Sequence, residues 1–251
     1  MLRSDGRPDD ECRPVKITLG FMPQAEGSTL IELGETRVIC TVSVENRVPP
    51  FLVGHGKGWV TAEYRMLPRS TNTRTPRDTG GRVDGRSTEI QRLIGRSLRA
   101  AVDRSRLGER TLTVDCDVLN ADGGTRTAAI TGAWIAVVLA CARLRASGQL
   151  SAPPVCRQVA AISAGIVQGR PLLDLAYAED SIADVDCNAV LTERGETVEF
   201  QLSSERELAR PEQVDVLRSL TLRGVDAMLR IQREVLHAAD STLLDLAVEG
   251  A

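Results

Sequence analysis

One stretch limits the possible folds of this 251-residue chain more than any other: a predicted strand that turns directly into a long apolar helix. Residues 111–119 alternate apolar and polar side chains, as a half-buried strand does. Residues 128–145 are apolar on nearly every side, so a helix there must be covered all round and is predicted to be the central buried helix. Gly123 and Gly124 stand between the two and predict a tight turn.

The same turn is a candidate anion site. A helix start presents unpaired N–H groups at the positive end of its dipole, which favours a bound phosphate. Thr125 and Arg126 add a hydroxyl and a guanidinium that can grip two phosphate oxygens. An ordinary structural turn is the alternative, because glycine is the usual turn residue, and the turn by itself does not decide between the two.

Other segments predict a mixture of strands and helices. Runs before residue 65 predict an antiparallel meander and later runs predict further strands, at residues 15–19, 28–33, 37–44, 59–64, 159–167, 171–176, 183–192 and 197–202. Thr88 and Gln91 form a capping box that predicts a helix start, and Pro211 opens a final amphipathic helix. The length allows one large or two small domains, and the strand-rich blocks on either side of the helices would suit two βα halves.

Composition narrows the class of protein. With 42% hydrophobic and 26% charged residues, the chain is predicted to be globular rather than disordered. No apolar run approaches the ~20 residues of a spanning helix, so no membrane partner is expected. The N-terminus lacks the apolar core of a secretory signal, which predicts a cytoplasmic protein. The 6 cysteines show no C-x-x-C spacing, which favours buried free thiols.

The charge is unevenly distributed. The net charge is −3, yet residues 65–106 hold eleven arginines against four acidic residues. Residues 67–86 show no periodicity and are predicted to form a long loop that carries Arg69, Arg74 and Arg77. The pattern favours a surface that faces a polyanion, with a solvated charged loop as the alternative. Arg86 directly precedes the predicted helix cap, where a cation is poorly placed unless an anion also binds.

A second cluster is acidic. Asp180, Asp184 and Asp186 come just before or within a predicted strand, and the last two point to one side of it. Neighbouring carboxylates repel one another unless a cation or solvent compensates. Mg²⁺ is typically held by one or two carboxylates together with phosphate oxygens, so the cluster is a candidate metal site. A charged, solvated strand edge is the alternative.

Four stretches, in the same order along the chain, together resemble the bacterial ribonuclease PH family: residues 66–71, 86–99, 121–128 and 179–188. The resemblance covers essentially the whole chain. It implies one α+β domain, residues 1–251, with mixed sheets and βα halves, assembled as a homohexameric ring that is a trimer of dimers. It also implies a phosphate-dependent exoribonuclease that trims the 3′ ends of tRNA precursors and other RNA and releases nucleoside diphosphates.

The resemblance further implies roles for individual residues. Arg86, Gly124, Thr125 and Arg126 match phosphate-binding positions, and Asp180 and Asp186 match the acidic catalytic pair, which would also hold Mg²⁺ or Mn²⁺. Asp184 matches less well. RNA contact is assigned to four arginines of the basic segment: Arg69, Arg74, Arg77 and Arg99. Inorganic phosphate would be the co-substrate, attacking the terminal phosphodiester while arginines and metal neutralise its charge.

The chain also departs from the family pattern. Residues 201–205 read Gln-Leu-Ser-Ser-Glu where Gln-Gly-Thr-Ala-Glu is expected, which raises a question about the local backbone. Asn72 replaces a common histidine, and Asn120 a common glutamine. Two other functions compete with the first. A non-catalytic RNA-binding ring subunit would have lost the anion site or the acids, and a metal-dependent hydrolytic nuclease would need no second anion site.

Overall fold

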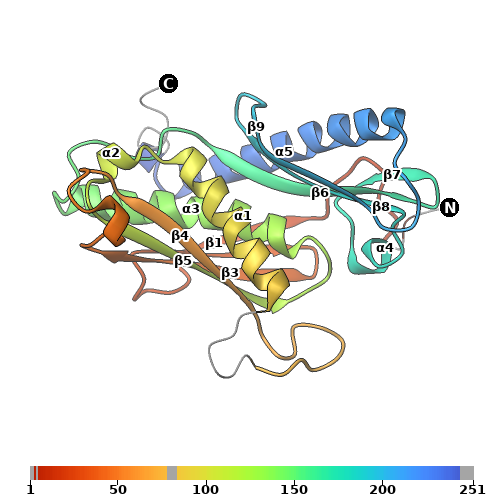
Figure 1. The fold of residues 1–251 in the computed structure, drawn as a ribbon, viewed down its shortest axis with the longest axis horizontal. Helices are drawn as coiled ribbons and strands as arrows, with labels where there is room; N and C mark the ends of the chain where they lie inside the picture. Colours follow the sequence, from red (N-terminus) through yellow and green to blue (C-terminus); the bar gives the residue numbers. More distant parts are fainter. Residues whose placement is uncertain (1–2, 4, 78–83, 244–251) are drawn as a thin grey trace.

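Two β-sheets and the helices packed on them make up this computed structural model, which describes every residue except 1–2, 4, 78–83 and 244–251 (Figure 1). The first sheet has the order β1-β2-β3-β5-β4 and consists of β1 (Val15–Leu19), β2 (Gly27–Leu33), β3 (Thr36–Glu45), β4 (Trp59–Met66) and β5 (Thr111–Asn120). The second sheet has the order β7-β6-β8-β9 and consists of β6 (Val159–Val167), β7 (Arg170–Leu173), β8 (Val185–Thr192) and β9 (Thr197–Ser204).

The helices form layers with these sheets. The long ones are α1 (Gly85–Ala101), α3 (Thr125–Ala146) and α5 (Pro211–Ala239), and the short ones are α2 (Arg104–Leu107), α4 (Tyr177–Asp180) and the 3₁₀ turn Pro50–Leu52. α3 lies between the sheets and contacts β2 and β3 on one side and β6 on the other (Figure 1). α1 packs on β4, and α5 covers the second sheet through β6, β7 and β8.

The apolar character of α3 follows from this position. By length and composition α3 could cross a membrane, with a mean hydropathy of 1.7, so the expectation that no apolar run approaches spanning length was wrong. Within the protein, 83% of that apolar window is buried, because sheets cover it on two sides. The predicted central buried helix is therefore present and accounts for the apolar run without a membrane.

The predicted antiparallel meander was only partly right. β1, β2 and β3 are antiparallel neighbours, but β5 lies between β3 and β4, and β4 pairs with β5 in parallel. The reason is the connection: the chain leaves β4, passes through α1, and returns along β5, and a helical crossover joins parallel strands. This crossover brings the beginning of α1 beside the end of β5, where the glycine turn begins.

Two of the element boundaries that differ from the sequence prediction bear on the position of the site. α1 begins at Gly85 rather than Thr88, because the Asp84 side chain accepts hydrogen bonds from the Ser87 backbone N–H (2.9 Å) and hydroxyl (2.6 Å) and so caps the helix earlier. Arg86 therefore lies within the first turn of α1. β7 ends at Leu173 because Asp174 adopts a left-handed conformation (φ 53°), and residues 174–184 then form a loop that contains α4.

The predicted arginine loop leaves the body of the protein between β4 and α1. Its described part, residues 67–77, extends beyond the end of the first sheet (Figure 1). Arg69, Arg74 and Arg77 are all exposed on it. Within the described residues, the one hydrogen bond that their side chains make to the protein runs from Arg69 to the Asn72 carbonyl oxygen (3.0 Å). Residues 78–83 of the predicted loop lie outside the described residues.

Candidate active site

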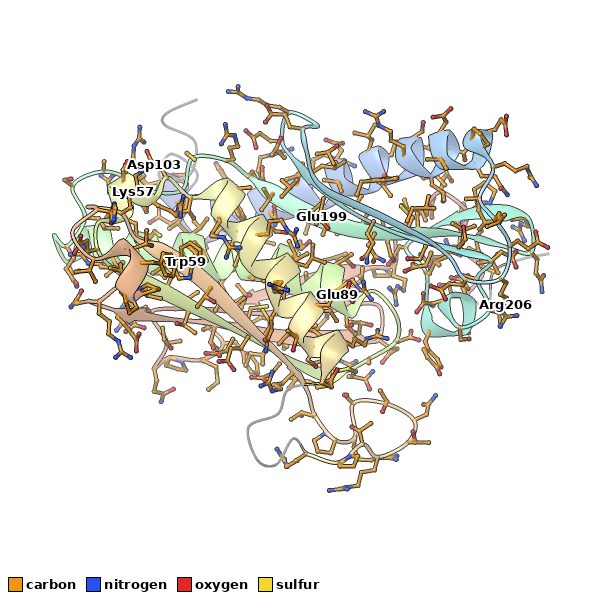
Figure 2. All side chains as sticks on the ribbon, viewed as in Figure 1. Lys57, Trp59, Glu89, Asp103, Glu199 and Arg206 are labelled. Atoms are coloured by element: carbon orange, nitrogen blue, oxygen red, sulfur yellow. The ribbon has the colours of Figure 1, made fainter. Side chains whose placement is uncertain are left out.

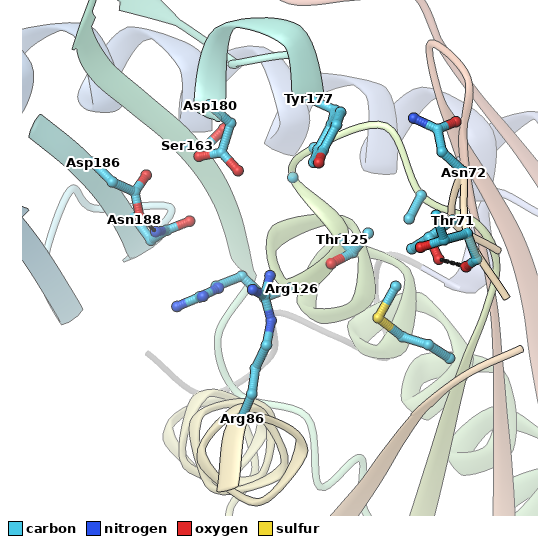
Figure 3. A pocket seen from close by; sticks show the side chains of 15 residues that line it. Thr71, Asn72, Arg86, Thr125, Arg126, Ser163, Tyr177, Asp180, Asp186 and Asn188 are labelled. Atoms are coloured by element: carbon cyan, nitrogen blue, oxygen red, sulfur yellow. Dashed lines mark hydrogen bonds between the residues drawn. The ribbon is translucent and has the colours of Figure 1, made fainter. Parts of the chain in front are cut away.

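A cavity of about 370 Å³ lies where the beginnings of α1 and α3 meet α4 and β8 (Figure 3). Residues from chain segments far apart in sequence line it. Among them are all six residues predicted for phosphate and acid chemistry: Arg86, Gly124, Thr125, Arg126, Asp180 and Asp186. The fold therefore brings both predicted clusters to one place, and this is the candidate active site.

The glycine turn forms one wall of the cavity. Gly123 and Gly124 have φ of 75° and 65°, and Gly124 is the N-cap of α3, so Thr125 and Arg126 occupy its first turn. A Cβ on Gly123 would lie 2.4 Å from the Leu175 carbonyl oxygen. Glycine is thus required both for the left-handed backbone and for the close approach of the segment that leads into α4. The turn leaves the first N–H groups of α3 at the cavity.

Thr125 is oriented by a tyrosine that sequence reasoning missed. The Tyr64 hydroxyl donates a hydrogen bond to the Thr125 Oγ1 (2.8 Å), and both side chains are buried. Burial raises the pKa of Tyr64, so the phenol stays protonated as the donor. The Thr125 hydroxyl then has its own proton to donate to an anion in the cavity. The only signal for Tyr64 was its position on the inward face of an alternating strand.

Arg126 is anchored on one side. Its Nη1 donates to the Gln201 Oε1 (3.1 Å) and lies 3.6 Å from the Glu89 Oε1, and the Gln201 Nε2 donates to the same Glu89 oxygen (3.1 Å). Glu89 lies on α1 where this helix faces β9, the strand that carries Gln201 (Figure 2). These contacts hold the guanidinium at the edge of the cavity with only part of its hydrogen-bonding capacity used.

Arg86 reaches into the cavity from the first turn of α1, toward Arg126 (Figure 3). Among the residues that the structure describes, no hydrogen bond or ion pair engages its side chain. Both arginines stand in the first turn of a helix, where the dipole disfavours a cation. Glu89 offsets part of the charge of Arg126, but no such partner is seen for Arg86 among the described residues, so this side of the cavity suits phosphate.

The acidic pair lies across the cavity from the arginine side. Asp186 extends from β8 and its Oδ2 accepts a hydrogen bond from the Asn188 Nδ2 (2.9 Å), while Asp180 ends α4 (Figure 3). Burial and the charge of Asp180 raise the pKa of Asp186 to about 6. Burial also raises the pKa of Asp180, against the opposing effect of Arg86 and Arg126. The pair therefore resists double ionisation.

This arrangement fits a divalent cation only together with a substrate. No group of three or more His, Cys, Asp or Glu side chains in the described residues could hold a metal ion without one. Asp180 and Asp186 supply two carboxylates beside a phosphate site, and Mg²⁺ commonly uses one or two carboxylates plus phosphate oxygens. The two aspartates are thus the residues that would hold Mg²⁺ or Mn²⁺, whose charge would offset that of the phosphates.

Asp184 does not join the pair. It precedes β8 instead of lying within it, and it does not line the cavity. Its backbone N–H donates to the Ile166 carbonyl oxygen (2.7 Å), and its carbonyl oxygen accepts from the Glu205 N–H (2.9 Å). The expectation that Asp184 and Asp186 share one face of a strand therefore fails, because the strand begins only at Val185.

The predicted RNA-contacting arginines lie outside the cavity. Arg69, Arg74 and Arg77 do not line it, although Thr71, Asn72 and Thr73 from the same loop do. Arg99 lies toward the other end of α1, where its guanidinium stacks 4.7 Å from the Trp59 ring centroid and donates to the Val60 carbonyl oxygen (2.9 Å). The half-buried Arg99 is thus engaged structurally, and RNA contact by all four arginines stays a prediction.

Two protein-family models match this chain, one over each of its two sheets. The model of the 3′ exoribonuclease family, domain 1, matches residues 11–143, and the model of its domain 2 matches residues 157–218. The chain belongs to the 3′ exoribonuclease family. The first match ends in α3 and the second begins just before β6, so each contains one sheet. That the family member folds as a single domain of residues 1–251 stays a prediction.

Solved structures share the fold of this family member. The Archaeoglobus fulgidus exosome with RNA bound to the active site contains a chain that matches with a TM-score of 0.77 and 25% identity over 94% of this chain and 92% of that one. An archaeal exosome core gives 0.76 and 24% over 92% and 91%, and rice (Oryza sativa) Rrp46 gives 0.73 and 19% over 93% and 100%. The predicted α+β fold with mixed sheets is confirmed.

The departure from the family pattern at residues 201–205 leaves the backbone regular. β9 pairs with β8 without a break there, and Ser203 stands opposite Asp186. The one irregularity in this ladder lies at Val190 and Leu191, away from the cavity. Glu205, just beyond β9, adds a negative charge that raises the pKa of both Asp180 and Asp186.

The sequence analysis did not predict several of the residues that line the cavity as site residues. Asn188 stands two positions after Asp186, so it points to the same side of β8, and that spacing was a usable signal. Ser163 is a lone hydroxyl in an otherwise apolar strand, β6. Tyr177 and Asn72 lie near the Thr125 side of the cavity in Figure 3. Asn72 was noted only as a departure from the family pattern, and Tyr177 had no local signal, because only packing brings its segment to the cavity.

Proposed function

We propose that this protein is a phosphate-dependent 3′→5′ exoribonuclease that removes nucleotides from RNA 3′ ends and releases nucleoside diphosphates. The observation that carries the proposal is a single cavity with an anion-binding side opposite an acidic pair. A metal-dependent hydrolytic nuclease would need only the acidic pair, Asp180 and Asp186, to hold its metal ion. A second anion site beside them is what a reaction between inorganic phosphate and a phosphodiester requires.

The chemistry follows from these positions. Inorganic phosphate is held by the N–H groups at the start of α3, by Thr125, and by Arg86 and Arg126. One of its oxygens attacks the phosphorus of the terminal phosphodiester, a new P–O bond forms, and the bond from phosphorus to the preceding ribose 3′ oxygen breaks. The arginines stabilise the charge on the equatorial oxygens, so positioning and electrostatics provide most of the rate.

The leaving 3′ oxygen takes a proton. With a pKa of about 6, Asp186 is protonated in about one molecule in ten at pH 7, compared with about one in a thousand for an ordinary aspartate, which makes it the candidate proton donor. Asn188 fixes the orientation of that carboxyl through its hydrogen bond to the Oδ2. When Asp186 is ionised, Asp180 and Asp186 together would hold Mg²⁺ or Mn²⁺, which would supply further charge neutralisation.

The substrate class is proposed to be tRNA precursors together with other RNA 3′ ends. The exposed arginines of the 67–77 loop support a long, polyanionic substrate, since a short one would not reach them. The similarity to a chain of the Archaeoglobus fulgidus exosome with RNA bound to the active site also supports RNA as the substrate. Assembly is proposed to be a homohexameric ring, a trimer of dimers.

Incubation of a 3′-labelled RNA with Mg²⁺, with and without inorganic phosphate, tests the proposal. Labelled nucleoside diphosphate that forms only with phosphate is the expected product. Nucleoside monophosphate released without phosphate would identify a hydrolytic nuclease instead. RNA binding without any nucleotide release would identify a non-catalytic ring subunit. Arg86→Ala should raise the phosphate concentration needed for half the maximal rate by about tenfold or more.

A further inference from the structure

Arg13 is a buried arginine outside the cavity, and it connects the two chain segments that form opposite sides of the cavity. Its side chain is 4% exposed and belongs to the segment that leads into β1. Arg13 has no part in the chemistry proposed above, because it does not line the cavity. Its contacts nevertheless reach both the glycine turn and the segment that carries α4.

On the side of the segment that leads to α4, Arg13 forms an ion pair with Asp174, whose side chain is fully buried. The Arg13 Nε and Nη2 donate to the Asp174 Oδ2 (2.9 Å) and Oδ1 (2.7 Å), and the Arg13 backbone N–H also donates to the Oδ2 (2.7 Å). Asp174 stands at the left-handed corner that ends β7, and its own N–H donates to the Ser163 carbonyl oxygen (2.7 Å). This corner sets where the segment toward α4 begins.

On the other side, Arg13 holds the glycine turn. Its Nη1 donates to the Asp122 carbonyl oxygen, and its Nη2 lies 3.4 Å from the Gly123 carbonyl oxygen. Asp122 closes the connection, because its Oδ2 lies 3.7 Å from the Arg13 Nη1 and its Oδ1 accepts from the Tyr177 N–H (3.3 Å) at the start of α4. One planar guanidinium thus spans the two segments.

The far end of α4 is fixed separately. The Arg3 Nε and Nη2 donate to the two carboxylate oxygens of Glu179 at 2.8 and 2.6 Å, and the Arg3 Nη1 donates to the Leu173 carbonyl oxygen (2.8 Å). Glu179 immediately precedes Asp180. With this end of α4 held, the distance between Asp180 and the glycine turn depends on the contacts that Arg13 makes.

We propose that Arg13 is a positioning residue. Its guanidinium is bound at once to Asp174 and to the carbonyl oxygens of Asp122 and Gly123, and these bonds set the separation between bound phosphate and the acidic pair. The proposal rests on the proposed function. A buried ion pair is weak evidence for added stability, since desolvation offsets much of the attraction, whereas its directional bonds fix geometry. Reacting groups displaced by about 1 Å lose on the order of a hundredfold in rate, so this geometry matters to the reaction.

The test compares three variants of the full chain. Arg13→Lys keeps the charge, but a lysine cannot bind Asp174 and the glycine turn at the same time through a planar guanidinium. Asp122→Ala removes the side chain that links the turn to α4, at a position that is only half-buried. Arg7→Lys is the matched control. Arg7 lies 3.4 Å from the same Asp174 Oδ2 and donates to the Asp174 carbonyl oxygen (3.0 Å), yet no hydrogen bond or ion pair recorded for the described residues joins it to the turn.

Two readouts are needed: calorimetric titration with inorganic phosphate in the absence of RNA, and the steady-state rate as phosphate is varied. Arg13→Lys and Asp122→Ala should weaken phosphate binding by about tenfold or more and lower kcat as well, whereas Arg7→Lys should lower the melting temperature with phosphate binding within about twofold of wild type. Equal phosphate affinity and kcat in Arg13→Lys and Arg7→Lys would overturn the proposal.

The readouts also separate this proposal from the proposed function. Wild-type protein that binds phosphate but releases no diphosphate removes the proposed function, and the calorimetric comparison still tests Arg13. Wild-type protein that binds no phosphate overturns both. If Arg13→Lys does not fold, Asp122→Ala decides: unchanged phosphate affinity and kcat in that variant would overturn the proposal, and a loss of both would support it.

Discussion

At the scale of single residues, the partly buried carboxyl of Asp186 is held in surroundings that disfavour its charge. Burial and the neighbouring Asp180 disfavour its charged form and raise its pKa from 3.8 to about 6. The same shift that permits proton donation has a cost in stability. Between pH 3.8 and 6 the unfolded chain releases this proton while the native protein keeps it, so the contribution of Asp186 to stability falls as the pH rises.

Asp186→Asn should therefore stabilise the protein at neutral pH. The variant and the wild type should be equally stable below about pH 4, and the variant should gain about 1 to 3 kcal/mol above pH 6. Urea unfolding at several pH values, with a chelator and without phosphate, measures the difference. A variant that is less stable than the wild type at pH 7.5 would contradict the assigned cause of the pKa shift.

The same position carries a prediction about activity. Asp180→Asn and Asp186→Asn should each keep the fold and the assembly state and lose phosphorolysis by at least about a hundredfold, because each removes a carboxylate that would hold the divalent cation, and Asp186→Asn also removes the proposed proton donor. Asp184→Asn is the matched control, since Asp184 lies four residues from Asp180 but outside the cavity. It should keep most of the activity. Comparable losses in all three variants would point to a general structural defect.

At the scale of elements, the site depends on how closely the glycine turn approaches the segment before α4. Gly123 and Gly169 have nearly the same backbone angle, φ of 75° and 76°. A Cβ on Gly169 would meet nothing within 4 Å, whereas a Cβ on Gly123 would lie 2.4 Å from the Leu175 carbonyl oxygen. The two positions therefore separate backbone strain from the close approach of two segments.

Gly169→Ala should cost about 1 kcal/mol of stability, which is the strain of a left-handed alanine. Gly123→Ala should cost about 1 to 3 kcal/mol more and should also weaken phosphate binding, because the turn must move away from α4. Denaturant unfolding and calorimetry with phosphate measure the two effects. Equal destabilisation by both substitutions would show that the close approach is not required.

At the scale of the whole molecule, the arginine loop extends beyond the body of the protein (Figure 1). Residues 71–73 of the same loop line the cavity. The exposed arginines of this loop form a surface with which the chain can recruit a large polyanionic substrate. Copies of the loop brought together in a ring would grip one RNA at several points while its 3′ end reaches a cavity.

Replacement of Arg69, Arg74 and Arg77 by alanine together should flatten the salt dependence of tRNA binding, because fewer phosphates are neutralised. Phosphorolysis of a very short oligoribonucleotide should fall much less. Binding isotherms at several salt concentrations measure the first effect, and light scattering after size exclusion reports the assembly. Smaller species would make the loop chiefly an assembly element, and equal losses on long and short RNA with an intact ring would count against both roles.

The sequence by itself determined the local features of this protein. Alternation and β-branched runs placed most of the strands, the absence of a polar face marked α3 as the central helix, and the glycine pair marked the turn before it. These predictions succeeded because each depends on neighbouring residues: backbone preference, side-chain period and the need to cover an apolar surface act within one segment. The motifs that resemble the family are local in the same sense.

Only the tertiary structure decided how these segments meet. The insertion of β5 between β3 and β4, the hydrogen bond from Tyr64 to Thr125 and the span of Arg13 from Asp174 to the glycine turn all join residues far apart in the chain. The raised pKa of Asp186 is likewise a property of its surroundings, because burial and a second carboxylate produce it. Pairing and burial depend on contacts across the folded protein, and local sequence patterns do not specify those contacts.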